Sequence, residues 1–261
     1  MDLGLKDKVA IVTEGTTAIG EAIARALAEE GAVVVFGGAD AAKVARSQAA
    51  LRGQGADVTG TRADIASPAD VRRLVDETLA RCGRIDIVVS NAGTEVTGTI
   101  DEVTAEQVTE LMRRKLTGPW ELARAVAPHM RQRGSGRFVV VIGDAGKIPG
   151  RSVIASAIAG AAQHAFVKSL SDDLGRSNVL VTGVSVGHIG PAAEAPPVAR
   201  ELHVSRSLGQ QESGWAADVP LGRWGTAADV ANAVAFLCSD RSSFISGSNL
   251  DVDGGDQRSI F

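Results

Sequence analysis

The sequence contains no tyrosine and only two cysteines, and aromatic residues make up 3% of its 261 positions. The absence of tyrosine excludes any mechanism that needs a phenol from this chain. Cys82 and Cys238 cannot build a disulfide framework, which fits a reducing, cytosolic setting. Because no cysteine, histidine or carboxylate cluster has metal-ligand spacing, we predict no metal site.

Long apolar runs and a one-sided charge are also absent. No uninterrupted apolar stretch approaches the roughly 18 residues that suggest a membrane span. The first eight residues lack the basic-then-apolar order of a signal peptide. The net charge is −4, with both signs interspersed, which argues against a nucleic-acid-binding surface. We therefore expect a cytoplasmic protein that binds neither nucleic acid nor membrane.

The chain alternates short apolar segments with amphipathic ones. Continuous apolar strands separated by helices predict a parallel sheet covered on both faces, and right-handed crossovers make it doubly wound. We predict an α/β fold of the Rossmann type with about seven strands. The expected strands are 9–12, 33–36, 58–62, 85–89, 137–142, 179–184 and 249–252. The expected helices are 19–28, 41–51, 68–81, 104–131, 152–174 and 227–238.

No linker, internal repeat or low-complexity segment divides the chain, so we expect one domain over residues 1–261. The segment from about 190 to 219 contains Pro191, Pro196 and Pro197 and is long for a connection within a domain. Such segments are usually lids or binding loops. We predict a substrate loop there.

Several short motifs follow one another in a recognisable order. They are Asp64-Ile65, Ser90-Asn91-Ala92-Gly93, Leu116-Thr117-Gly118, Val186-Gly187 and, near the end, Val252-Asp253-Gly254-Gly255. Together they resemble the short-chain dehydrogenase/reductase family over nearly the whole chain. The resemblance implies a Rossmann-type fold, a nicotinamide dinucleotide cofactor and an Asn-Ser-Tyr-Lys catalytic set.

The cofactor turn departs from the family pattern T-G-x-x-x-G-x-G. Glu14 and Ala18 replace two of its three glycines. A carboxylate at position 14 would lie near two anionic phosphates, which is unfavourable in a partly desolvated site. The alternative is that Gly15 shifts the turn by one residue and a dinucleotide still binds. We therefore expect no cofactor, or NAD or NADP only if the turn tolerates Glu14 and Ala18.

If a dinucleotide binds, the resemblance implies which residues contact it. NAD-binding relatives have an acid at the end of the second strand and NADP-binding ones a nearby arginine, but Gly38-Ala39 expresses neither preference. The candidates are Thr13, Gly15, Ile19, Gly20, Asp64, Asn91, Ala92 and Gly93.

The family's catalytic positions also read differently. Ungapped registration places Ser156 at the tyrosine and Gly160 at the lysine, and the family spacings place Gly143 at the serine and Lys115 at the asparagine. A register slip of three residues would give Val153 and Ala157 instead, and neither titrates. A serine hydroxyl without an activating base does not replace a tyrosine as a proton donor. By the family mechanism we predict no catalytic residue.

Three polar residues remain as candidates for other chemistry. Lys115 would face the pocket as an acid, a base or an anion holder, or it would pair with a carboxylate such as Asp144. Asp144 follows the fifth strand, at the sheet edge where α/β proteins bind ligands, or it caps a turn. His188 follows Val186-Gly187 and is the histidine best placed for proton transfer, unless it faces solvent.

Three functions follow from these expectations. The first is a pseudoenzyme, a subunit without its own hydride transfer that supports an active relative, similar in kind to the inactive subunit of a heteromeric family member. The second is a lyase, isomerase or cyclase that reuses the pocket, and the third is an atypical NAD(P)-dependent oxidoreductase. Small residues around 156–165 allow close helix approach. We expect a homo-oligomer, or a hetero-oligomer with an intact relative, through helices 104–131 and 152–174.

Overall fold

The computed structural model describes residues 2–190 and 219–257 and contains a seven-stranded, wholly parallel sheet. Its strand order is β3-β2-β1-β4-β5-β6-β7, so the order reverses between β1 and β4. The predicted Rossmann-type fold is confirmed. The strands are β1 Val9–Val12, β2 Val33–Gly38, β3 Val58–Arg62, β4 Ile87–Ser90, β5 Gly136–Gly143, β6 Val179–Val186 and β7 Asn249–Val252.

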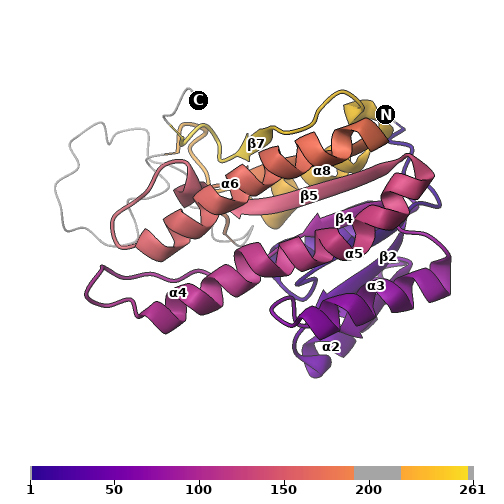
Figure 1. Ribbon diagram of the computed structural model, residues 1–261, viewed down its shortest axis with the longest axis horizontal. Coiled ribbons are helices and arrows are strands. Elements are labelled where there is room, and N and C mark those ends of the chain that lie inside the picture. The colour runs from indigo at the N-terminus through magenta and orange to yellow at the C-terminus, as the bar shows by residue number, and fades with distance from the viewer. Residues whose placement is uncertain (1, 191–218, 258–261) are drawn as a thin grey trace.

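Helices connect the strands and cover both faces of the sheet. The α-helices are α1 Ala18–Glu29, α2 Ala41–Gly53, α3 Pro68–Cys82, α4 Ala105–Met112, α5 Gly118–Arg133, α6 Ile154–Leu174 and α8 Ala227–Cys238. Short 3₁₀ turns lie at η2 Asp144–Gly146, η3 Gly175–Ser177 and η4 Asp240–Ser242. Figure 1 shows α3, α5 and α6 crossing one face of the sheet, with α8 on the other.

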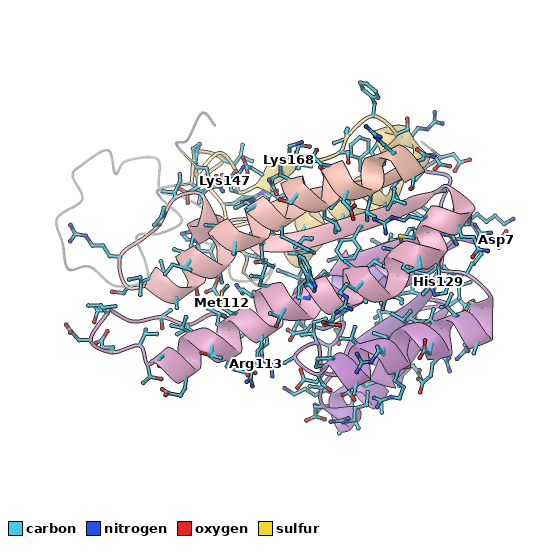
Figure 2. The ribbon with its side chains drawn as sticks, viewed as in Figure 1. Asp7, Met112, Arg113, His129, Lys147 and Lys168 are labelled. Atoms are coloured by element: carbon cyan, nitrogen blue, oxygen red, sulfur yellow. The ribbon has the colours of Figure 1, made fainter. Side chains whose placement is uncertain are left out.

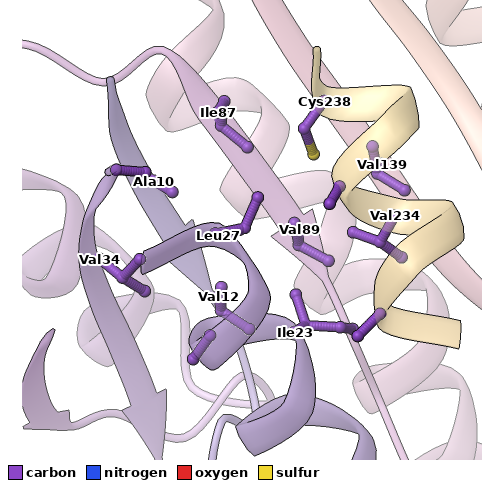
Figure 3. Packing of buried hydrophobic residues seen from close by; sticks show 14 of the residues in the cluster. Ala10, Val12, Ile23, Leu27, Val34, Ile87, Val89, Val139, Val234 and Cys238 are labelled. Carbon is purple, nitrogen blue, oxygen red and sulfur yellow. The ribbon is translucent and has the colours of Figure 1, made fainter. Parts of the chain in front are cut away.

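Two apolar cores hold these layers together. On one face, Ile23 and Leu27 of α1 and Val234 of α8 pack onto β1 and β4 (Figure 3). On the other, α3, α5 and α6 pack onto the same sheet around Phe138 and Phe166. All four residues of β1 are buried, because helices cover both of its faces. The sheet is therefore a rigid base that holds the loops at its carboxyl edge.

The predicted helix 104–131 is interrupted in the structure. A π-helical turn, η1 Arg113–Thr117, separates α4 from α5 just after Met112 (Figure 2). The N–H of Gly118 donates to the carbonyl of Arg113, five residues earlier, which is the hydrogen bond of a π-helix. The next residue, Pro119, has no N–H to donate to the carbonyl of Lys115. The wider turn changes the direction in which Lys115 projects, and π-bulges often mark functional sites.

The other predicted elements agree with the structure to within a few residues. The predicted strands 58–62 and 249–252 and the helix 227–238 have the observed bounds. The predicted helix 152–174 begins two residues late, because Ser152 has a left-handed φ of 58°. The expected substrate loop, residues 190–219, lies almost wholly outside the described residues. Within them, no helix combines the length and apolar character that crossing a bilayer requires.

Candidate active site

A cavity of about 940 Å³ opens at the carboxyl edge of the sheet. It begins beside Ile19 and Asn91 at the reversal of strand order, and it continues past β5 to the segment after β6. This edge is where doubly wound sheets bind their ligands. Most of the predicted candidates share its wall: Ile19, Asn91, Ala92, Gly93, Lys115, Gly143, Asp144, Ser156 and His188.

The turn between β1 and α1 keeps a close backbone approach despite its altered glycines. A Cβ atom on Gly20 would lie 2.3 Å from the carbonyl oxygen of Glu14, so only glycine fits there. Glu14 itself has a left-handed φ of 47°, a conformation that costs a non-glycine residue roughly 1 kcal/mol. Gly15 donates to the carbonyl of Gly37 at 2.8 Å, which ties the turn to the end of β2.

The side chain of Glu14 connects this turn to the segment after β4 and to Arg114. Its carboxylate accepts a hydrogen bond from the backbone N–H of Gly93 at 3.0 Å and lies 3.4 Å from Nη1 of Arg114. The same Nη1 lies 3.3 Å from Asp64, and Nε of Arg114 lies 2.9 Å from Glu110. The carboxylate that the sequence places next to the phosphate site is thus paired with a cation.

The remaining turn residues hold one another in place. Thr13 Oγ1 donates to the carbonyl of Asn91 at 2.9 Å and accepts from its N–H at 3.0 Å. The side-chain amide of Asn91 donates to the Glu14 carbonyl and to Thr17 Oγ1. Thr17 also caps α1 by accepting from the N–H of Gly20. The ends of β1 and β4 therefore form one connected framework.

Lys115 is the most buried titratable residue of the cavity wall, with 4% of its surface exposed. Burial lowers its pKa, and the charges of Glu95 and Glu14 oppose that effect. Across the part of the chain that the structure describes, Lys115 forms no ion pair, so the expected pairing with Asp144 is not observed. A buried ammonium with a lowered pKa is a suitable acid for a reacting oxygen.

Asp144 and His188 line the same cavity, after β5 and β6. Burial raises the pKa of Asp144, whereas the nearby charge of His188 lowers it. Nε2 of His188 lies 4.0 Å from a carboxylate oxygen of Asp256. His188 lines the cavity with 32% of its side chain exposed, so its role stays a prediction. Asp144 is the first residue of the 3₁₀ turn η2, whose N-cap is Gly143 and which has no side-chain cap, so the turn-capping alternative is not observed.

Ser156, Gly160 and Gly143, which were assigned to family catalytic positions, each lie close to another segment of the fold. Ser156 Oγ accepts from the N–H of Val96 at 3.0 Å and donates to the carbonyl of the same residue at 3.1 Å. A Cβ atom on Gly160 would lie 2.7 Å from the Cα of Gly146, so no side chain fits there. A Cβ atom on Gly143 would lie 3.7 Å from Oε1 of Glu95. Their assignment to family positions stays a prediction.

Sequence reasoning missed several residues of the site. Glu95 and Asp256 line the cavity, and Arg114 links Glu14 to Asp64. Glu95 lies two residues beyond Gly93, at the carboxyl end of β4, and that position could have revealed it. The links of Arg114 to Asp64 and Glu14 gave no local signal, since these partners lie 50 and 100 residues away in the sequence.

Comparison with known proteins gives consistent matches along almost the whole chain. The family described as Enoyl-(Acyl carrier protein) reductase matches residues 15–256. The 4-formylbenzenesulfonate dehydrogenase of Comamonas testosteroni is 33% identical, over 97% of this chain and 99% of its own. The 3-oxoacyl-[acyl-carrier-protein] reductase of Escherichia coli is 30% identical, over 97% of this chain and 98% of its own.

Solved structures agree with this result. A gluconate 5-dehydrogenase from Burkholderia cenocepacia, in complex with NADP and tartrate, has a TM-score of 0.85 at 30% identity, and the match covers 99% of each chain. The fold, the cavity at the strand reversal and these matches define a Rossmann-type oxidoreductase scaffold. This chain belongs to the short-chain dehydrogenase/reductase family.

The comparisons correct the predicted function. A subunit without its own hydride transfer, supporting an active relative, was the first expectation, and it is wrong: the full-length relatives are named dehydrogenases and reductases. The non-redox alternative is no better supported by these matches. The cofactor expectation was no cofactor, or NAD or NADP if the turn tolerates Glu14 and Ala18; the second alternative agrees with a relative solved in complex with NADP.

Proposed function

We propose that this chain is an NAD(P)-dependent oxidoreductase that interconverts a carbonyl compound and an alcohol, with Lys115 exchanging the proton. The observation that carries the proposal is the position of Lys115, buried in the wall of a cavity at the strand reversal. The relatives support the reaction class, since their names describe dehydrogenases and reductases. Lys115 removes the need for a tyrosine that the sequence does not contain.

The described residues fit a dinucleotide. The cavity extends from Ile19 and Gly93 to Val186 and His188 and is large enough for part of such a ligand. The Glu14 carboxylate is paired with Arg114, so it does not present an unscreened charge to the groove. The residues that would hold the cofactor are Thr13, Gly15, Ile19, Gly20, Asp64, Asn91, Ala92 and Gly93.

When bound, the reduced nicotinamide supplies a hydride to the carbonyl carbon. The chain must then supply one proton to the oxygen, and in the reverse direction accept it. Lys115 does this from its ammonium form, because burial weakens its hold on the proton. The negative charges of Glu95 and Glu14 oppose this lowering of the Lys115 pKa and favour the ammonium form. In this proposal Asp144 and His188, which line the same cavity, return a proton to the site.

Ser156 has a positioning role in this account. Its hydroxyl is fixed on the backbone of Val96 and thereby fixes the segment that follows Glu95. Since Glu95 is the carboxylate with the largest effect on Lys115, this segment sets the charge around the proton donor. Ser156 acts on the reaction through Glu95 rather than by donating a proton.

We also propose that copies of the chain associate through α5 and α6. Trp120 and Ile158 are each 53% exposed on these helices, and Ile154 adds to the same apolar surface. The ring of Trp120 packs against Phe166 of α6, with centroids 6.1 Å apart, so the two helices present one continuous face. Ile158→Glu should lower the mass measured by light scattering, whereas the unchanged mass of that variant would refute the interface.

The test of the proposed function combines binding and turnover. The purified chain is titrated with NADH and NADPH, and oxidation of the bound dinucleotide is followed with a carbonyl panel of an aromatic aldehyde, a keto sugar acid and a 3-oxoacyl thioester. We expect Lys115→Met to bind dinucleotide like the parent chain but to lose turnover about 100-fold or more, the range of general acid catalysis.

Lys115→Arg is the matched control, because it keeps the charge but cannot release the proton. It should be as slow as Lys115→Met. Failure of the parent chain to bind either dinucleotide, or full turnover in Lys115→Met, would overturn the proposal.

A further inference from the structure

The end of β2 has no carboxylate available for a ribose. A Cβ atom on Gly38 would lie 2.9 Å from methyl groups of Thr16 and Val44, so no larger residue fits without movement. Asp40, the next acid along the chain, caps α2 by accepting from the N–H groups of Ala42 and Lys43. A dinucleotide-binding fold commonly uses an acid in this region to accept from the ribose 2′-hydroxyl.

Glu14 brings a carboxylate close to this region from a different element, and that carboxylate accepts from the backbone N–H of Gly93 after β4. The turn that carries it is tied to the end of β2 by the hydrogen bond between Gly15 and Gly37. The N–H of Ala63 bonds to the Gly38 carbonyl, which places Asp64 beside this strand end as well. Glu14 and Asp64 then meet on one guanidinium nitrogen, at 3.4 and 3.3 Å.

Arg114 is not available to bind an additional phosphate. Its guanidinium serves Glu14, Asp64 and Glu110, and Glu110 also lies 3.9 Å from Nη1 of Arg113. Its side chain is 23% exposed, and the Glu14 side chain 17%, so solvent screens this group only partly. A 2′-phosphate at this position would face the carboxylates of Glu14 and Asp64, whereas a neutral hydroxyl group can donate a hydrogen bond to them.

We infer that Glu14 is the residue that selects the dinucleotide: it accepts from the adenosine ribose hydroxyls and excludes a 2′-phosphate. The chain then uses NAD(H) in preference to NADP(H), unlike the solved gluconate 5-dehydrogenase with its bound NADP. The substitution that seemed to disable the cofactor turn becomes its specificity determinant. This inference rests on the proposed function, because it requires that a dinucleotide binds in the groove.

The experiment measures affinity by isothermal titration calorimetry, without any turnover. The ligands are NAD⁺ and NADP⁺, and AMP and adenosine 2′,5′-bisphosphate as fragments that lack the nicotinamide. We expect the parent chain to bind NAD⁺ at least about tenfold more tightly than NADP⁺, because like charges at an interface are strongly unfavourable. The two fragments should show the same order.

Glu14→Gln keeps the shape of the side chain and removes its charge. We expect the affinity ratio of NAD⁺ to NADP⁺ to fall about tenfold in this variant, mainly through tighter NADP⁺ binding. Glu29→Gln is the matched control, since it makes the same change at the exposed far end of α1. Melting temperatures establish that both variants are folded.

The outcomes separate the two proposals. Equal affinities in the parent chain, tighter NADP⁺ binding, or an unchanged ratio in Glu14→Gln would overturn the role of Glu14 and leave the proposed oxidoreductase intact. If the folded parent chain bound neither dinucleotide, the proposed function would fail and this inference with it.

Discussion

Gly160 lies directly against the backbone of Gly146, where helix α6 crosses the turn that follows β5. A Cβ atom on Gly160 would be 2.7 Å from the Cα of Gly146, and one on Gly146 would be 2.5 Å from the carbonyl carbon of Gly160. Both neighbours are backbone atoms, so neither can turn aside as a flexible side chain could. The contact fixes α6 against the cavity wall and explains why this position carries no side chain.

Gly160→Ala is therefore expected to destabilise the protein although alanine favours helices. Overpacking of this kind costs about 1–3 kcal/mol, more than the roughly 1 kcal/mol that alanine gains over glycine in a helix. Urea unfolding gives the free energy directly. Gly53→Ala, at the open end of α2, is the control and should be neutral or stabilising. Equal effects at the two sites would refute the close contact.

Ser156→Ala should reduce stability by about 1–2 kcal/mol, because it leaves the N–H and the carbonyl of Val96 without their shared partner. The exposed Ser169 lies on the same helix, and Ser169→Ala should change little. If Ser156 were the proton donor, the alanine variant would lose nearly all turnover. We expect a modest fall in turnover and a shifted pH profile, which reports on Glu95 and Lys115.

Lys115→Met should raise stability near neutral pH. Since burial lowers the folded-state pKa of Lys115, the unfolded chain binds more protons at any pH between that lowered pKa and the normal value of 10.5. The free energy of unfolding of the parent chain should thus rise with pH over that range, and the advantage of Lys115→Met should shrink. Unfolding curves at several pH values test this, and an advantage independent of pH would contradict it.

The contribution of Asp144 to the free energy of unfolding changes with pH in the opposite direction. Burial raises its folded-state pKa above 3.8, so the folded chain binds more protons than the unfolded chain between these two values. The stability contribution of Asp144 is thus lost as pH rises through this window. Asp144→Asn should be more stable than the parent chain at neutral pH and lose that advantage in acid. Asp101→Asn, on an exposed loop, is the control.

The sequence predicted the sheet well because its determinants are local. A few neighbouring residues are enough to predict the strand Val9–Val12 and the capped helix that begins at Pro68. The motifs at strand ends also placed Asn91 and His188 correctly on one edge, since parallel strands end together. Most of the residues that line the cavity and had been named as candidates could be predicted in this way.

The remaining features depend on contacts between distant residues. The ion pair of Glu14 with Arg114 joins positions 100 residues apart, and without it the turn reads only as an obstacle to phosphate. The π-turn around Lys115 lies just before Pro119, within a segment whose apolar pattern predicts one continuous helix. With the ion pair and the π-turn known, Glu14 is no longer an unpaired charge, and Lys115 is seen to be buried in the cavity wall.

The most direct test of the account is transfer of a label from cofactor to product. The purified chain is incubated with NADH carrying deuterium at both C4 hydrogen positions and with the carbonyl panel, and the alcohol product is examined by mass spectrometry. We predict one deuterium on the carbinol carbon with the parent chain and its loss in Lys115→Met. An unlabelled product, or no alcohol from a chain that binds NADH, would contradict hydride transfer by this protein.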